Sequence, residues 1–146
     1  MNRFVKPLLL TAGLVFSLGA SATDQLNNTK WTNFNKKGEP NAVLKFTEKR
    51  GKLSAEIVEI LDPKANKSAC KVCKGKYQNK SLIGATVIWN LEPDDNNPNN
   101  YISGEGIDPK TGKGFSGKAQ LEGNTLKLRG YKGVALLGQT HILKRL

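Results

Sequence analysis

The sequence predicts an all-β protein, an eight-stranded antiparallel meander closed as a barrel. Short segments with alternating apolar and polar residues recur along the chain, and turn residues separate them at regular spacing. The 146 residues include 15 glycines and few long runs of helix-favouring residues, which argues against an α-helical bundle. An open sheet of this size would expose two edges that promote aggregation, whereas closure removes both.

Eight segments of the sequence carry the strand pattern, most of them separated by short turns. They cover Thr29–Asn33, Asn41–Glu48, Lys52–Leu61, Ile83–Leu91, Tyr101–Ile107, Gly114–Leu121, Thr125–Tyr131 and Gln139–Arg145. In the third segment the alternation slips at Val58 and Ile60, which predicts a β-bulge. In the fourth segment we expect one buried face that carries Ile83, Ala85, Val87, Trp89 and Leu91. A two-sheet sandwich is the alternative to the closed barrel.

Two longer connections interrupt the predicted meander. The first, Asp62–Leu82, has a length that is uncommon in compact domains and is often functional. The second, Glu92–Asn100, is polar and rich in Asn and Asp. Its Asp94–Asn97 stretch lacks the spacing and the closing Glu of an EF-hand loop, so we interpret it as a turn and not as a calcium site.

The first residues have the pattern of a secretory signal peptide. Arg3 and Lys6 precede the apolar stretch Leu8–Leu18, and Ala20-Ser21-Ala22 supplies the small residues that a signal peptidase recognises. The apolar stretch is too short to span a bilayer comfortably. We therefore predict a signal peptide over residues 1–22, cleavage between Ala22 and Thr23, and an exported domain over residues 23–146. An uncleaved anchor is the alternative.

Short motifs are spread over nearly all of residues 23–146. They are Trp31, Gly51-Lys52-Leu53, Leu61-Asp62-Pro63, Cys70 with Cys73, Leu82-Ile83-Gly84, Trp89, Ile107-Asp108-Pro109, Lys127–Gly138 and Arg145. Together they resemble DUF2147, a bacterial family of secreted proteins of unknown function, and Lys127–Gly138 is the most specific part. The resemblance implies a lipocalin-like barrel in the periplasm of a Gram-negative bacterium, and it implies no established activity.

Cys70 and Cys73 are the only cysteines in the sequence. In an exported chain we expect them to form a disulfide with each other that pins the connection Asp62–Leu82. A redox pair is one alternative, because neighbouring lysines could lower a thiol pKa. A metal site is another, but two sulfurs need two more ligands and His141 is the one obvious candidate. The favoured interpretation predicts no metal.

The same connection is strongly basic, in a chain whose formal net charge is +11. Its lysines are Lys64, Lys67, Lys71, Lys74, Lys76 and Lys80, with no acid among them. Such a cluster attracts phosphate groups and lipid headgroups, and a solvated loop without a partner is the alternative. Tyr77 is the only aromatic side chain there that could stack on a base, so we expect no nucleic-acid partner.

Arg129 has two possible roles. Alternation with Leu128 places it on the outer face, where it would stack on Trp31 and seal one end of the barrel. A register slip at Gly130 would instead turn it inward, as an anchor for a ligand carboxylate or phosphate. We favour the structural role.

No residues in the sequence form a recognisable catalytic group. The single histidine, His141, has no Ser or Cys partner in view, and the closely spaced Glu105 and Asp108 show no sign that either acid is buried. We therefore expect neither enzymatic activity nor a cofactor.

The favoured hypothesis is a periplasmic barrel that binds a small apolar or amphipathic ligand. The predicted cavity lining consists of Leu44, Phe46, Ile57, Val87, Trp89, Phe115 and Leu128. The alternative is a filled barrel that acts as an interaction module of the cell envelope. In that case the basic connection would dock on anionic lipid, lipopolysaccharide or an acidic protein.

Overall fold

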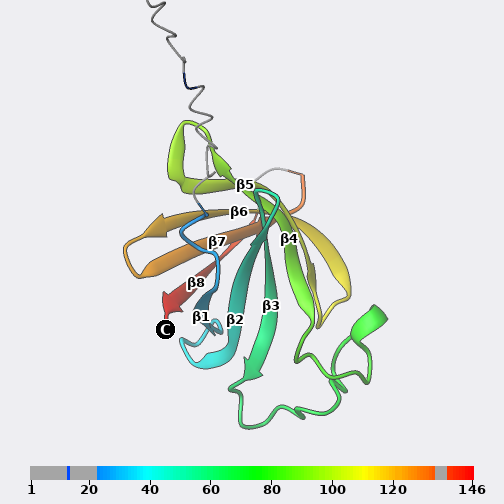
Figure 1. The fold of residues 1–146 in the computed structure, drawn as a ribbon. Helices are drawn as coiled ribbons and strands as arrows, with labels where there is room; N and C mark the ends of the chain where they lie inside the picture. The colour runs from blue at the N-terminus through cyan, green and yellow to red at the C-terminus, as the bar shows by residue number, and fades with distance from the viewer. Residues whose placement is uncertain (1–12, 14–22, 134–137) are drawn as a thin grey trace, which may run out of the picture.

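The structure, a computed structural model, describes residues 13, 23–133 and 138–146. The described strands form a closed antiparallel barrel in chain order, in which each strand pairs with the next and β8 pairs with β1 (Figure 1). They are β1 (Thr29–Phe34), β2 (Pro40–Lys49), β3 (Lys52–Ile60), β4 (Thr86–Asp94), β5 (Asn97–Asp108), β6 (Lys113–Glu122), β7 (Thr125–Tyr131) and β8 (Gln139–Arg145). The predicted fold class is confirmed. The predicted signal peptide, apart from Gly13, lies outside the described residues.

The connection between β3 and β4 contains the short 3-10 helix η1 (Gly75–Tyr77). Within the described residues, no helix is long and apolar enough to cross a membrane.

The predicted polar connection Glu92–Asn100 is wrong, because β4 and β5 continue through it as a hairpin. Asp94 pairs with Asn97, which leaves two residues for the turn. The Asp94 side chain accepts a hydrogen bond from the Asn96 backbone N–H at 3.0 Å. Asp and Asn form such local bonds readily, so the same residues that suggested a loop make a tight turn.

The bulge predicted in the third strand is confirmed. Val43 pairs with Glu59 and Leu44 pairs with Ile57, so Val58 is the extra residue on β3. The bulge lets both Ile57 and Ile60 point into the barrel, because it shifts the alternation by one residue.

The buried face predicted for the fourth strand is partly wrong. Thr86 pairs with Glu56 and Ile88 with Ala55, so an extra residue lies between them and both Val87 and Ile88 are buried. Asn90 then adopts a positive φ of 58°, and the next buried position is Leu91. These two irregularities leave Trp89 only half-buried and outside the core. Ile83 precedes the strand and is 47% exposed.

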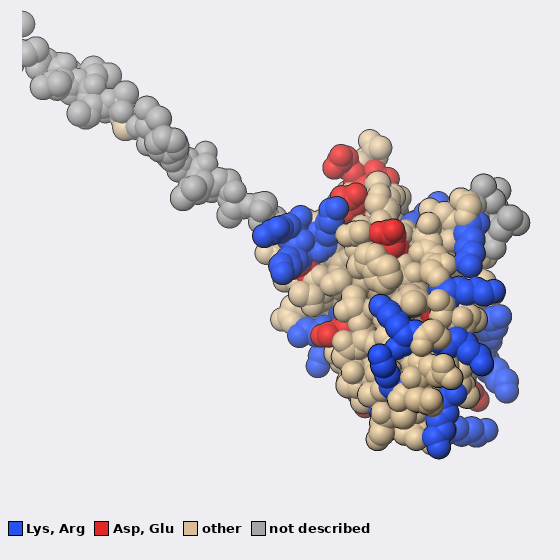
Figure 2. Space-filling view, turned by 90° about the vertical axis from the view of Figure 1, so that its right-hand side faces the viewer, with Lys and Arg blue, Asp and Glu red and all other residues tan. Residues whose placement is uncertain are grey.

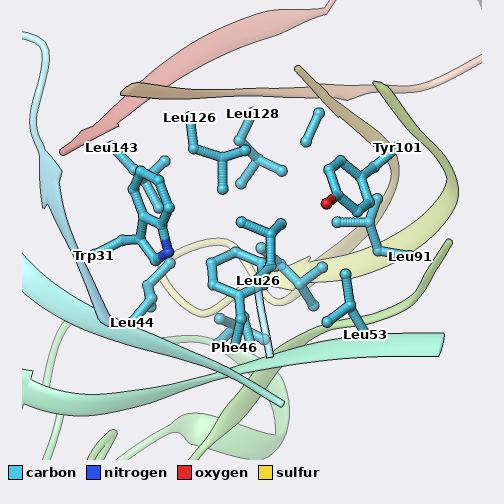
Figure 3. Close-up of a cluster of buried hydrophobic side chains, with 14 of the residues drawn as sticks. Leu26, Trp31, Leu44, Phe46, Leu53, Leu91, Tyr101, Leu126, Leu128 and Leu143 are labelled. Atoms are coloured by element: carbon cyan, nitrogen blue, oxygen red, sulfur yellow. The ribbon is translucent and has the colours of Figure 1, made fainter. Parts of the chain in front are cut away.

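The core fills the barrel with aliphatic and aromatic side chains from all eight strands and from the segment before β1 (Figure 3). Trp31 and Phe46 are fully buried, and the Trp31 indole N–H donates to the Thr29 hydroxyl at 2.8 Å. Phe115 packs onto this core across the neighbouring strands. A Cβ at Gly106 would lie 2.3 Å from the Phe115 ring, so the aromatic ring occupies the space that the glycine leaves free.

Residues 23–28 close one end of the barrel. Leu26 from this cap inserts into the core and is fully buried. Asp24 accepts a hydrogen bond from the Tyr101 hydroxyl at 3.0 Å, and the Glu48 carboxylate accepts one from the Asp24 backbone N–H at 2.6 Å. Burial, with a further contribution from the Asp24 charge, raises the pKa of Tyr101 far above its usual value.

The other end of the barrel carries the turn after β1, the β3–β4 connection, the turn after β5, and Lys132 and Gly133 after β7. In an antiparallel meander these alternate connections must all lie at one end, opposite the cap. The Lys74 backbone N–H donates to the Pro109 carbonyl at 3.0 Å, which ties the β3–β4 connection to the turn between β5 and β6.

Candidate functional site

An open groove of about 640 Å³ lies at the seam where β8 meets β1. The ladder between these strands runs from the pair Trp31–Arg145 to the pair Asn33–Leu143. Beyond the last pair, Gln139–Ile142 stay paired with β7, whereas the chain after Phe34 enters the turn to β2. The two strands therefore separate, and the groove occupies the opening between them.

The groove combines apolar and cationic side chains. Phe34 and Ile142 supply its apolar walls, and Lys36 and Lys144 supply two positive charges. None of the described residues that line it is acidic. Lys144 is held in place because its ammonium donates to the Thr125 hydroxyl at 2.7 Å. This mixture suits a ligand with an apolar body and an anionic group.

Residues from both faces of β8 line the groove. His141 pairs with Leu128 and Gln139 pairs with Gly130, so both groove residues lie on the same side of the sheet as the core residue Leu128. His141 is exposed, whereas Leu143, two residues further along the same face, is fully buried. The inner face of β8 thus changes from apolar to polar at the groove.

Most of the predicted cavity-lining residues lie inside the barrel. Leu44, Phe46, Ile57, Val87 and Leu128 belong to the buried core, and Phe115 is partly buried and packs against it. Trp89 lies outside the core, because the irregular pairing of β4 turns its side chain away from the barrel interior. These side chains form the packed interior next to the groove, whereas most of the groove residues were missed by the sequence analysis.

The cation that stacks on Trp31 is Arg145, not Arg129. The Arg145 guanidinium lies 4.6 Å from the indole centroid, and the two residues are a cross-strand pair. Arg129 faces outward, as alternation with Leu128 predicted, and its guanidinium donates to the Thr140 hydroxyl at 2.8 Å. It lines a second, smaller hollow of about 350 Å³ on the outer surface, together with Asn100 and Lys118. Arg145 stacks on Trp31 because the register of β1 and β8 places these two residues directly opposite each other.

Cys70 and Cys73 form the predicted disulfide, with their Cα atoms 5.3 Å apart. The Cys73 side chain is buried, whereas Val72 between the two cysteines is 70% exposed. The Cys70 backbone N–H donates to the Lys80 carbonyl at 2.7 Å, and the Asn79 N–H donates to the Cys70 carbonyl at 2.9 Å. The bridge therefore closes a local ring within the connection, and the two hydrogen bonds tie Cys70 at the start of that ring to Asn79 and Lys80 near the end of the connection.

The basic loop, which we define as residues 62–82, presents its lysines to solvent. Lys64, Lys67, Lys71, Lys74, Lys76 and Lys80 are all exposed. Tyr77 anchors the loop to the barrel, because its ring is buried and its hydroxyl donates to the Thr86 carbonyl at 3.0 Å. The Lys76 ammonium lies 5.0 Å from the centroid of that ring. The loop thus has a fixed base and a charged outer surface.

The acidic residues singled out in the sequence have structural partners. Glu105 accepts a hydrogen bond from the Asn90 amide at 2.7 Å, and Asp108 accepts one from the Lys110 backbone N–H at 2.9 Å. Within the part of the chain that the structure describes, no three His, Cys, Asp or Glu side chains gather in a group that could hold a metal ion.

The sequence analysis missed most of the groove because the groove depends on where a strand pairing ends. Phe34 and Lys36 follow the first predicted strand. Nothing in their local pattern shows that β8 extends beyond the end of its pairing with that strand. The available signal was a mismatch of length, because the first predicted strand was shorter than the last. Two neighbouring strands of unequal length leave a stretch of the longer one without a partner.

Comparisons with known proteins agree with the fold. Residues 29–145 match the family model DUF2147, described as an uncharacterized protein conserved in bacteria. A similar solved structure is described as "Protein HP1028 from the human pathogen Helicobacter pylori belongs to the lipocalin family". It shares 23% sequence identity with a TM-score of 0.66, and the match covers 85% of this chain and 84% of that chain. No match is found among curated proteins.

Proposed function

We propose that this chain, which belongs to the DUF2147 family of bacterial proteins, is an exported periplasmic barrel that binds a small amphipathic ligand. The groove between β1 and β8 carries the proposal, because it is an open hollow of about 640 Å³ beside the apolar barrel interior. Ligand sites in proteins commonly have volumes of roughly 300 to 1,000 Å³ and combine apolar walls with a few polar groups. The likeness to a lipocalin-family structure supports the barrel as a ligand-binding scaffold.

The charges of the groove favour an anionic group on the ligand. Lys36 and Lys144 flank apolar walls formed by Phe34 and Ile142. A carboxylate or phosphate would pair with the lysines, while an acyl or aromatic body would cover the apolar walls and extend towards Leu128.

In this proposal the protein binds and releases its ligand unchanged. The residues of the groove include one histidine and no acid to serve as its partner. Nucleophilic catalysis by Ser or Cys commonly uses a histidine base that a third group orients. The signal-peptide pattern of residues 1–22 supports export, and in a Gram-negative cell the periplasm would be the destination.

Binding can be tested with residues 23–146 and the anionic dye 1-anilinonaphthalene-8-sulfonate, followed by its fluorescence. Phe34→Ala should weaken the dye's affinity at least about fivefold, because the change removes an aromatic wall of the groove. Ile102→Ser is the control, since Ile102 is an exposed apolar residue of β5 that lines the second hollow instead. If Ile102→Ser weakened binding and Phe34→Ala did not, the second hollow would be the site and the proposal would fail.

The charge preference has its own matched pair of variants. Lys36→Gln and Lys37→Gln change the net charge equally and lie in the same turn, but Lys36 lines the groove and Lys37 does not. Lys36→Gln should weaken binding of the anionic dye about fivefold and leave binding of the uncharged dye Nile red unchanged. Equal effects of the two variants would show that the charge acts at long range and not inside the groove. Native mass spectrometry of protein taken directly from the periplasm would then identify a co-purified ligand.

A further inference from the structure

We propose that the basic loop, residues 62–82, docks the groove end of the barrel on a bilayer of anionic phospholipid, with Val72 inserted among the headgroups. Val72 is 70% exposed although it is a large apolar residue, and the Cys70–Cys73 disulfide holds it at the tip of a four-residue ring. Exposed apolar side chains with cationic neighbours are typical of surfaces that bind a membrane interface.

The charge around Val72 has one sign. Lys71 lies inside the ring and Lys74 follows it directly, and the other four loop lysines are exposed as well. In Figure 2 most of the acidic side chains gather near the top of the visible face, whereas lysine and arginine side chains cover much of its right and lower parts and form a further group at the upper left. Phosphate-bearing headgroups complement such a surface.

The positive charge extends beyond the loop to the whole end of the barrel. The neighbouring turns at this end add exposed Lys36, Lys37, Lys110 and Lys132. The acids of these segments among the described residues are Glu39, Asp62 and Asp108. The capped end, in contrast, mixes the acids Asp24, Glu48, Asp94, Asp95 and Glu122 with the exposed basic residues Lys49, Arg50 and Lys52. An anionic surface would therefore attract the protein in one orientation.

The exposed apolar residues in and next to the basic loop favour a bilayer over an acidic protein as the partner. Ile83 is 47% exposed and follows directly after the loop, so the same segment presents two large apolar side chains to solvent. Binding to the carboxylates of an acidic protein needs only the lysines. At a lipid interface, in contrast, an exposed apolar side chain adds affinity by inserting among the headgroups. The ring around Val72 is fixed in advance, which lowers the ordering cost of insertion.

The docked orientation would place the groove mouth at the membrane. The turn that contributes Lys36 to the groove lies at the same barrel end as the basic loop. A lipid-like ligand could then pass between the bilayer and the groove without crossing water. This last step rests on the proposed function, whereas docking itself does not require a ligand.

Docking can be tested by co-sedimentation of residues 23–146 with vesicles of phosphatidylcholine alone or mixed equally with phosphatidylglycerol. The protein should bind the mixed vesicles, bind the neutral vesicles weakly, and lose affinity steeply as salt is raised. Lys71→Gln/Lys74→Gln should weaken binding roughly 25-fold, at about fivefold for each lysine. Lys49→Gln/Lys52→Gln makes the same charge change in the turn after β2, at the capped end, and should weaken binding less than about threefold.

The contribution of Val72 separates lipid from other partners. Val72→Ser should weaken vesicle binding at least about threefold without changing its salt dependence, because it removes apolar and not charged contacts. Ile102→Ser, on β5 outside the loop, should have no effect. Equal losses for the two double lysine variants, or binding of polyglutamate as tight as of mixed vesicles with no effect of Val72→Ser, would overturn the proposal.

The two proposals fail separately. If the loop variants lost vesicle binding but bound the anionic dye in solution as the wild type does, docking and the groove would both stand. If Phe34→Ala left dye binding intact while vesicle binding followed the predictions above, docking would stand and the groove function would fall.

Discussion

Trp31 illustrates how one residue joins several elements of this barrel. Its ring is fully buried in the core, its indole N–H bonds to Thr29, and Arg145 stacks on its face from β8. It therefore links β1 to the last strand at the point where the barrel closes. Trp89, the other tryptophan, is half-buried and lies outside the core.

The two tryptophans should differ in their effect on stability. Trp31→Ala should lower the free energy of unfolding by about 3–5 kcal/mol, because it leaves a large cavity in the core. Trp89→Ala should lower it by only about 1 kcal/mol. Urea unfolding of both variants measures the difference. Equal losses would mean that Trp89 is as deeply buried as the sequence pattern first suggested.

Tyr101 should make stability fall at alkaline pH. Burial raises the pKa of its hydroxyl in the folded barrel, whereas in the unfolded chain it titrates near its ordinary value of 10.0. The folded state therefore keeps a proton that the unfolded state releases, so this contribution is complete below about pH 10 and is lost as the pH rises further.

The variant Tyr101→Phe tests this effect. It should cost about 1 kcal/mol at pH 8 through the lost hydrogen bond to Asp24, and it should show a shallower fall in stability between about pH 9 and 11. The two proteins share every other residue, so the difference between the two curves isolates Tyr101. Parallel curves would show that the hydroxyl ionises equally in both states.

At the scale of elements, the sequence predicted what depends on local pattern. All eight strands were recognised, and the slip at Val58 correctly indicated the β3 bulge. The irregular pairing of β4 was missed because Ile83 to Leu91 alternate regularly in sequence. Only the pairing with β3, which inserts extra residues on β4, reveals that Ile88 replaces Trp89 in the core. The groove was missed for a related reason, since it depends on where β1 and β8 stop pairing.

The basic loop should behave as an element separate from the barrel. Its base is fixed by Tyr77 and by the hydrogen bond from Lys74 to Pro109, and neither contact requires the disulfide. Cys73→Ser should lower the free energy of unfolding by no more than about 2 kcal/mol, because the bridge closes a very small ring.

Amide hydrogen exchange of Cys73→Ser should rise within residues 62–82 and stay unchanged in β5 to β7. Circular dichroism should retain the β-sheet signal at room temperature. Global unfolding of this variant would show that the bridge supports the barrel as well as the loop.

The whole molecule has two unlike ends. Residues 23–28 close one end with Leu26 and a hydrogen-bonded carboxylate, whereas the other end carries the groove and the basic loop. This asymmetry follows from the meander, which gathers alternate connections at the same end. It gives the barrel one end that is closed by its own chain and one that carries both proposed binding surfaces.

The position of the cap predicts how export should process the chain. Asp24 bonds to Tyr101 and to Glu48, so cleavage between Ala22 and Thr23 leaves both of these contacts of the cap intact. Expression of the full sequence in a Gram-negative host should yield a periplasmic protein whose mass corresponds to residues 23–146, with both cysteines blocked to thiol reagents.

Paired variants at the cleavage site test this prediction, because a signal peptidase reads small residues immediately before the cut and two positions earlier. Ala22→Phe should therefore accumulate uncleaved precursor, whereas Ser21→Phe, at the intervening position, should be processed normally. A mature protein whose mass places its first residue beyond Asp24 would contradict the prediction. Such a protein would lack the carboxylate that binds Tyr101, and its stability should then resemble that of Tyr101→Phe.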